Sequence, residues 1–151
     1  MIITVDAKVD NWGKVLAFID EQLKAQGCPM RAMLELDVAA EEIFVNVAHY
    51  AYESGNGSVD VEMNFEEHPK AVTIKFSDRG RPYNPLERAD PDITLPAEKR
   101  QIGGLGIYMV KKSMDNVSYE YADGQNHLTI RRVFERKRPS YLTIEKEKEE
   151  C

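Results

Sequence analysis

The fold is decided by the stretch Ser58-Val59-Asp60-Val61-Glu62-Met63-Asn64-Phe65-Glu66 and its continuation Val72-Thr73-Ile74-Lys75-Phe76-Ser77-Asp78. Apolar and polar residues alternate through both segments, and a period of two residues predicts strands with one buried and one solvated face. His68-Pro69 lies between the segments, so we expect the chain to turn there and the strands to form a hairpin. The buried face of this hairpin requires a second layer of structure to cover it.

Upstream of the hairpin, the sequence predicts a strand and two helices that could supply this layer. The β-branched run Met1-Ile2-Ile3-Thr4-Val5 is typical of a strand. Apolar residues at helical spacing follow Asp10, which could cap the helix, and stop at Gly27. A second helix is expected from about Met30 to Glu53, because a glycine-rich turn follows.

Downstream of the hairpin, residues 79–102 carry several prolines and no sustained periodicity, and a loop of that length is more often a functional lid than filler. The remaining expected elements are a helix from about Gly104 to Met114 and a hairpin of Val117–Ala122 and His127–Phe134 around a turn at 123–126. The order of elements predicts an α+β two-layer sandwich, with a mixed, mostly antiparallel sheet covered on one face by helices.

Composition limits the class of protein. The 151 residues fit one domain, expected over residues 1–134, with a charged C-terminal tail over 135–151. Twenty Lys and Arg against 26 Asp and Glu leave a net charge of −6, which disfavours direct binding of nucleic acid as the main role. No apolar run approaches the ~18–20 residues of a membrane span, and no signal-peptide pattern opens the chain. The two cysteines fit neither a disulfide framework nor a zinc site, so we expect a soluble, cytoplasmic protein without a membrane partner.

Glu42 and Asn46 are the first candidate site residues. They are four residues apart in the second predicted helix, so they lie one turn apart on a single stripe that His49 continues. A carboxylate and an amide beside apolar residues cost desolvation energy unless something pairs with them. A binding site would explain the pair, but so would an exposed polar face, and the spacing alone favours the latter. His49 fits either a pocket wall or a structural histidine.

Asp78 is the second candidate. It follows Val72, Ile74 and Phe76 in the inward set of its strand, so its carboxylate should point to the layer between sheet and helices. Such a carboxylate could accept a hydrogen bond from an exocyclic amine such as adenine N6, and Gly80 would allow a ligand to approach closely. Alternatively, Asp78 simply starts a turn.

Gly103-Gly104-Leu105-Gly106 is the third candidate, placed where the long loop gives way to a helix. Exposed backbone amides at a helix N-terminus bind anions, although a tight turn explains the glycines equally well. Arg100, just upstream, could supply a positive charge to a terminal phosphate or could be an ordinary solvated arginine.

Glu42-x-x-x-Asn46, Asp78-x-Gly80 and Gly103-Gly104-Leu105-Gly106 occur in one order on suitable elements. Together they make the chain resemble the GHKL (Bergerat-fold) ATPases. Within these, the chain is similar to the small bacterial anti-sigma-factor serine/threonine kinases. The resemblance covers roughly residues 2–133.

The resemblance implies a role for each motif. Asn46 would hold a Mg²⁺ that bridges the phosphates of ATP, and Glu42 would be the general base. Asp78 would bind adenine N6 with help from Thr129, whose role rests on the resemblance alone because strand alternation sets it on the other face from Leu128. Residues 86–102 would form the ATP lid. The implied nucleotide-binding residues are Asn46, His49, Asp78, Gly80, Pro82, Arg100, Gly103, Gly104, Leu105, Gly106 and Thr129.

Two functions follow as hypotheses. In the first, the chain is a Mg-ATP-dependent kinase that phosphorylates an anti-sigma-factor antagonist, sequesters a sigma factor and forms a homodimer, as the resemblance implies. In the second, it is an ATP-binding switch that regulates a partner by binding alone. Glu42 favours the first hypothesis, because a pure binder needs no base at that spacing.

Overall fold

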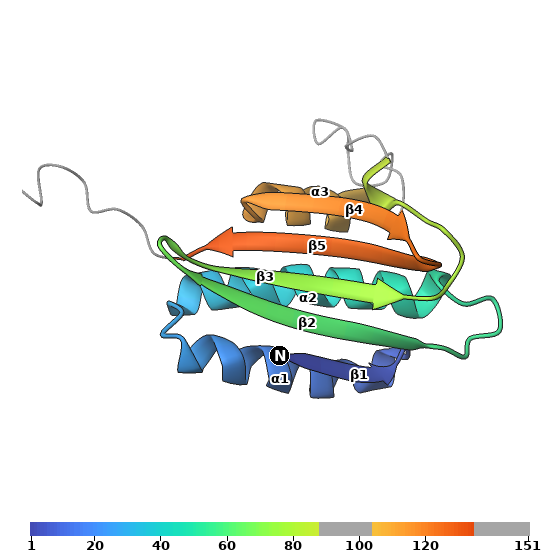
Figure 1. The fold of residues 1–151 in the computed structure, drawn as a ribbon, viewed down its shortest axis with the longest axis horizontal. Coiled ribbons are helices and arrows are strands. Elements are labelled where there is room, and N and C mark those ends of the chain that lie inside the picture. The colour runs from blue at the N-terminus through green and yellow to red at the C-terminus, as the bar shows by residue number, and fades with distance from the viewer. Residues whose placement is uncertain (88–103, 135–151) are drawn as a thin grey trace, which may run out of the picture.

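The computed structural model describes residues 1–87 and 104–134 (Figure 1). The elements in these ranges follow the predicted order: β1 (Ile2–Asp6), η1 (Val9–Asn11), α1 (Trp12–Ala25), α2 (Met30–Tyr50), β2 (Ser58–Glu67), β3 (Lys70–Asp78), η2 (Pro85–Glu87), α3 (Gly104–Ser113), β4 (Asn116–Ala122) and β5 (Gln125–Val133). None of the helices described there is both long and apolar enough to cross a membrane.

The strands form one sheet in the order β1-β2-β3-β5-β4, and each neighbouring pair is antiparallel. Figure 1 shows α1, α2 and α3 together on one side of this sheet. The predicted α+β two-layer sandwich is therefore confirmed. The described sheet is antiparallel throughout, rather than mixed: β2–β3 and β4–β5 are hairpins, and β1–β2 and β3–β5 also pair antiparallel across longer connections.

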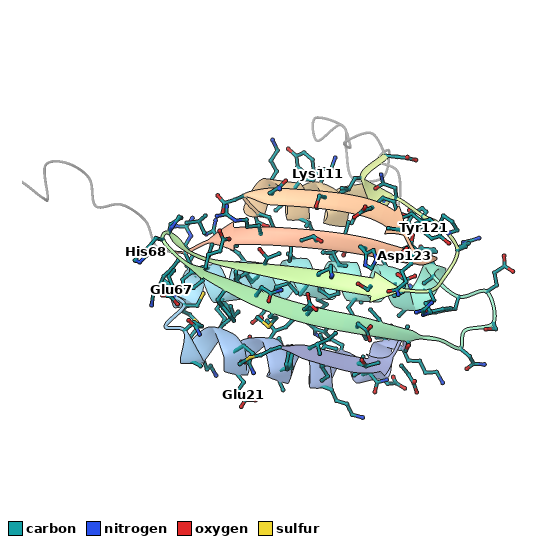
Figure 2. All side chains as sticks on the ribbon, viewed as in Figure 1. Glu21, Glu67, His68, Lys111, Tyr121 and Asp123 are labelled. Carbon is teal, nitrogen blue, oxygen red and sulfur yellow. The ribbon has the colours of Figure 1, made fainter. Side chains whose placement is uncertain are left out.

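The core lies between the two layers, as the alternating pattern of β2 and β3 requires. Its fully buried large side chains come from both layers: Val15, Ile19, Leu23, Leu36, Ile43, Phe44, Val59, Val61, Met63, Ile74, Phe76 and Ile130. The other face of the sheet carries polar pairs, such as the Thr4 hydroxyl, which donates to Asp60 over 2.6 Å. Figure 2 shows charged side chains, among them Glu67 and Lys111, around the rim of the molecule.

Element ends differ from the expected ones at three places. Asp10 lies inside η1 and makes no capping hydrogen bond to α1, which begins at Trp12. Helix α2 ends at Tyr50, three residues before Glu53. The β4–β5 turn contains only Asp123 and Gly124, both with positive φ (55° and 75°), as a two-residue hairpin turn requires. Strand β5 therefore begins at Gln125 rather than after the expected four-residue turn.

Candidate functional site

Asp78 and Asn126 are paired where β3 ends and β5 begins, and each is only 6 % exposed. Asn126 Nδ2 donates to Asp78 Oδ1 over 2.9 Å, and the backbone N–H of Gly80 donates to the same oxygen over 2.9 Å. Within the described ranges, no hydrogen bond reaches Asp78 Oδ2. A carboxylate oxygen at such low exposure lacks full hydration, so Oδ2 is available to a donor on a ligand.

Asn126 also holds the chain that follows β3. Its Nδ2 donates to the Arg81 carbonyl over 2.8 Å, while its Oδ1 accepts from the Tyr83 N–H over 3.1 Å and from the Tyr119 hydroxyl. Burial raises the pKa of Tyr119, which keeps the phenol neutral and able to donate. The Asn126 side chain is thus hydrogen-bonded to the end of β3, to the loop that follows it and to β4. Figure 2 shows its neighbours Tyr121 and Asp123 at this end of the sheet.

Gly80 brings the same loop against the end of α2. A Cβ atom at this position would lie 2.1 Å from the carbonyl oxygen of Ala51, a distance that no side chain can occupy. The contact is secured by Arg81, whose backbone N–H donates to the same oxygen over 3.0 Å and whose Nε donates to the Tyr50 carbonyl over 3.2 Å. These two bonds satisfy terminal carbonyl groups of the helix.

Glu42 and Asn46 are hydrogen-bonded to each other on α2. Asn46 Nδ2 donates to the Glu42 backbone carbonyl over 3.0 Å and to Glu42 Oε1 over 3.3 Å. The amide nitrogen is therefore committed to Glu42, and Asn46 Oδ1 is left as an oxygen ligand. The two side chains lie on one stripe of α2, as their spacing predicts, and the hydrogen bond fixes which atom of each side chain is available.

Gly106 of α3 lies directly against Glu42. A Cβ atom on Gly106 would stand 2.1 Å from the carboxyl carbon of Glu42. Glycine at this position therefore lets α3 approach α2 while the Glu42 carboxylate stays between the two helices. The third motif of the sequence analysis thus meets the first in space.

Two adjoining cavities connect these groups, sharing Asn46, Tyr50, Arg81 and Tyr83 in their walls. The inner cavity contains Asp78 and Asn126 among largely apolar side chains, and its volume of about 40 Å³ holds only a few water molecules. The outer cavity, of about 340 Å³, reaches Glu42 and His49. A purine could enter the inner cavity beside Asp78 only if the walls of that cavity separate. The outer cavity is large enough for a polar, charged group.

Three other predicted residues are placed less centrally. His49 lines the outer cavity but is exposed. Its ring stands nearly perpendicular to the Tyr50 ring, with 6.0 Å between the ring centroids. Pro82 is exposed and lines neither cavity. Thr129 pairs with Lys75 and Ser118, and lies on the sheet face opposite to buried Leu128 and Ile130.

The predicted contact of Thr129 with adenine is therefore not supported by its position. Strand alternation turns its side chain away from the helices, and Asn126, three residues earlier, occupies the pocket beside Asp78 instead. Arg100 and Gly103 lie outside the described residues. Gly104 is the first residue of α3 and Leu105 the second, but the position of the Leu105 side chain is likewise outside the description.

The sequence did not predict most of the residues that line the pocket, among them the polar Tyr50, Arg81, Tyr83, Tyr119 and Asn126. A signal existed for Asn126, because Asp123-Gly124 is a strong two-residue hairpin signature and starts the next strand early enough to turn Asn126 inward. Arg81 and Tyr83 lie in an irregular loop, where neither helical nor strand periodicity assigns a direction to the side chains.

The donor set fits a nucleotide and a hard cation. Asp78 Oδ2 can accept from an amine of a base, and the outer cavity offers the Arg81 side chain for a negatively charged group. Mg²⁺ prefers oxygen ligands and needs few of them from protein when phosphates supply the rest, which suits the single Asn46 Oδ1. The described residues contain no group of three or more His, Cys, Asp or Glu that could hold a metal by itself.

The fold and these groups define an ATP-binding domain of the histidine-kinase type, and comparison with known proteins assigns the chain to that class. Residues 5–132 match the family described as "Histidine kinase-like ATPase domain", and the chain belongs to this family. The predicted resemblance to GHKL ATPases is thereby confirmed.

Two similar proteins carry the names of a serine/threonine kinase and a serine kinase. The serine/threonine-protein kinase BtrW of Bordetella bronchiseptica is 26% identical over 100 residues, which cover 66% of this chain and 70% of BtrW. The serine-protein kinase RsbW of Oceanobacillus iheyensis is 26% identical over 118 residues, covering 75% of this chain and 73% of RsbW.

Two solved structures have a similar fold. The RsbU and RsbW domains of a Mycobacterium tuberculosis protein superpose with a TM-score of 0.61 at 16% identity, over 91% of this chain but only 33% of that one. The SiaB-SiaC complex of Pseudomonas aeruginosa gives a TM-score of 0.52 at 15% identity, over 87% of this chain and 89% of that one. At these identities the likeness concerns the fold alone.

Proposed function

We propose that this chain is a Mg-ATP-dependent serine/threonine protein kinase that phosphorylates a partner protein of the anti-sigma-factor-antagonist type and also sequesters a sigma factor, acting as a homodimer. The observation that carries the kinase activity is the Glu42–Asn46 pair at the mouth of the nucleotide cavities, where a base and a cation ligand stand one helical turn apart. The names of the kinases BtrW and RsbW support the same reaction.

In this proposal Asp78 selects adenine. Its Oδ1 is already occupied by Asn126 and Gly80, so its Oδ2 accepts the exocyclic N6–H of the base. Asn126 thereby orients the carboxylate and prevents it from turning. Gly80 keeps this wall of the pocket close to α2.

The outer cavity receives the phosphates. Asn46 Oδ1 would be the protein ligand of Mg²⁺, and the backbone amides at the start of α3, from Gly104 on, would donate to phosphate oxygens. Bound Mg²⁺ neutralises phosphate charge, which is the larger part of what phosphoryl transfer requires. Arg81, shared by both cavities, adds a positive charge near the same place.

Glu42 acts on the acceptor. Its carboxylate takes the proton of a serine or threonine hydroxyl while the hydroxyl oxygen bonds to the γ-phosphorus and the bond to the ADP oxygen breaks. A positioned general base contributes roughly 10²–10⁴-fold in rate. The hydrogen bond from Asn46 holds one carboxylate oxygen in place, so the other is directed to the substrate.

The experiment separates binding from transfer. ATP binding is measured by calorimetry with and without Mg²⁺, and appearance of phosphoserine on candidate antagonists is measured by mass spectrometry, for the parent chain and for Glu42→Gln and Asp78→Asn. We expect Glu42→Gln to bind Mg-ATP normally and to transfer phosphate at least about 10²-fold more slowly, and Asp78→Asn to lose binding. Equal transfer rates for the parent and Glu42→Gln would show that Glu42 is not the general base.

The alternative function is an ATP-binding switch that acts on its partner without transferring phosphate. It would be favoured if the parent binds Mg-ATP and the partner but no phosphorylated residue appears under any condition. The Glu42–Asn46 hydrogen bond argues for the kinase, because a switch gains nothing from an oriented carboxylate at the phosphate end of its pocket.

A further inference from the structure

The outer side of α2 carries an apolar stripe that the core does not use. Met30, Leu34 and Val38 are 62 %, 56 % and 65 % exposed, and they are spaced four residues apart on the helix. Met109 of α3, 53 % exposed, lies across from them. Large apolar side chains grouped in this way mark a surface that another molecule covers.

These side chains border a groove rather than a flat patch. Leu34, Val38 and Met109 line a cavity of about 430 Å³ between α2 and α3, and Ala39 and Val110 are buried in its floor. Aliphatic walls with methionine at one side suit the apolar side chains of a polypeptide, because methionine adapts its shape to what it contacts.

The charges in the groove are already paired. Glu35 bonds through Oε1 to Arg31 Nε over 3.3 Å and through Oε2 to Arg132 Nη2 over 3.1 Å. Glu42 is held by Asn46. Beside Leu34, Val38 and Met109 the groove therefore makes no demand for a charged ligand, and the Glu42 carboxylate at its end keeps one oxygen for the acceptor hydroxyl.

The groove ends at the proposed base. Glu42 continues the stripe one helical turn beyond Val38, and its carboxylate borders both this groove and the outer nucleotide cavity. From Met30 to Glu42 the stripe runs twelve residues, or about 18 Å of helix. A polypeptide bound in the groove would therefore have one end beside the Glu42 carboxylate, which in the proposed reaction contacts the acceptor hydroxyl.

We propose that the α2–α3 groove is the docking surface for the acceptor protein, and that it binds an amphipathic helix of that protein. Apolar residues of the helix at i and i+4 fill the sites beside Leu34, Val38 and Met109, and its serine or threonine follows at the Glu42 end. This inference rests on the proposed kinase function. It adds the chemistry by which the acceptor is recognised, which is apolar and separate from the nucleotide contacts.

The test places a photoreactive probe in the groove. The chain with Val38 replaced by benzoylphenylalanine is irradiated in the cells that encode it, and cross-linked proteins are identified and purified. Each is then offered to the parent chain with Mg-ATP, and KM and kcat for phosphorylation are compared for the parent, Val38→Asp, Met109→Asp and the control Val9→Asp. Val9 is a 46 % exposed aliphatic residue outside the groove.

We expect a cross-linked protein to be phosphorylated by the parent. Val38→Asp and Met109→Asp should raise its KM at least about ten-fold, the change that 1.4 kcal/mol produces, with ATP affinity unchanged and Val9→Asp equal to the parent. Unchanged KM in both groove variants would overturn the docking surface and leave the kinase intact. A captured protein that binds through the groove but is never phosphorylated would overturn the kinase. Cross-links only to a second copy, to residues 135–151 of this chain, or to nothing would overturn the docking of an acceptor protein in the groove.

Discussion

The carboxyl groups of Asp20 in α1 and Asp37 in α2 lie close enough to interact with each other between the two helices. The Oδ1 atoms of both are buried, and no N–H or hydroxyl of the described residues reaches them. Two carboxyl groups can share a hydrogen bond only when one of them carries a proton. Burial first, and then the hydrogen bond and charge of Asp20, raise the pKa of Asp37 from 3.8 to about 7.

This pair predicts that stability depends on pH near neutrality. A carboxyl group whose pKa is raised by folding favours the folded state while it is protonated, so the free energy of unfolding should fall as pH rises from about 4 to about 7. Asp37→Asn keeps a neutral donor beside Asp20 and should flatten the profile, so that it is more stable than the parent at pH 8. Urea denaturation across this range measures the effect, and exposed Asp10→Asn is the control.

Gly106→Ala should separate activity from stability. The new Cβ would displace only the end of the Glu42 side chain, which is flexible, while alanine improves helix propensity by about 1 kcal/mol. We expect thermal stability within about 1 kcal/mol of the parent and phosphoryl transfer at least about ten-fold slower, because a misplaced base loses its geometry. Gly13→Ala in α1 meets nothing within 4 Å and should leave transfer unchanged. Normal transfer in Gly106→Ala would show that Glu42 need not stay where it is.

Gly80→Ala, in contrast to Gly106→Ala, should lower the stability of the domain as well as its function. Here the added Cβ would meet the backbone of Ala51 at 2.1 Å, and backbone cannot move aside as a side chain can. We expect a loss of stability of about 1–3 kcal/mol in urea denaturation together with weaker ATP binding, because the loop carrying Arg81 would be pushed off α2. A variant as stable as the parent would mean that the loop is free to move.

Asn126→Ala tests how Asp78 is held. Removal of the Asn126 amide leaves the Tyr83 N–H, the Arg81 carbonyl and Asp78 Oδ1 each without one hydrogen bond. Each buried unsatisfied group lowers the free energy of unfolding by about 1–3 kcal/mol. ATP affinity, measured by calorimetry, should fall at least about ten-fold, since the carboxylate can then rotate.

Asn64→Ala is the control for this variant. Asn64 is exposed on the polar face of the same sheet and its side chain bonds to the exposed face's Glu62, so both stability and affinity should stay near those of the parent. A variant Asn126→Ala with normal ATP affinity would show that Gly80 alone suffices to orient Asp78.

The fold was predictable because one strong pattern determined it. The alternation through β2 and β3 identified two strands and the face they bury, and Asp78 came out inward and buried because it continues that alternation. The same argument set Thr129 on the outer face, and its position agrees with that argument rather than with the role implied by resemblance.

The rest of the site depends on contacts that no local pattern encodes. Asn126 was assigned to a turn of four residues, and the actual turn of two shifted it into the strand. The approach of Gly106 to Glu42 joins two residues of different helices that are more than sixty positions apart in the chain, so spacing within one element could not reveal it. The Asp20–Asp37 contact likewise joins two helices, and each aspartate in isolation resembles an ordinary surface residue.

The pairing of β3 with β5 has a consequence for how the chain acquires its function. Asp78 and Asn126 are 48 residues apart, and the hydrogen bonds between them form only when the last strand of the sheet has docked. Contacts between distant segments form late, because closing the intervening loop costs entropy first. During synthesis, the first 78 residues can build most of the core without a working purine pocket. In the proposed function, nucleotide binding would therefore report that the whole domain has folded, and an incompletely made chain could not compete for ATP.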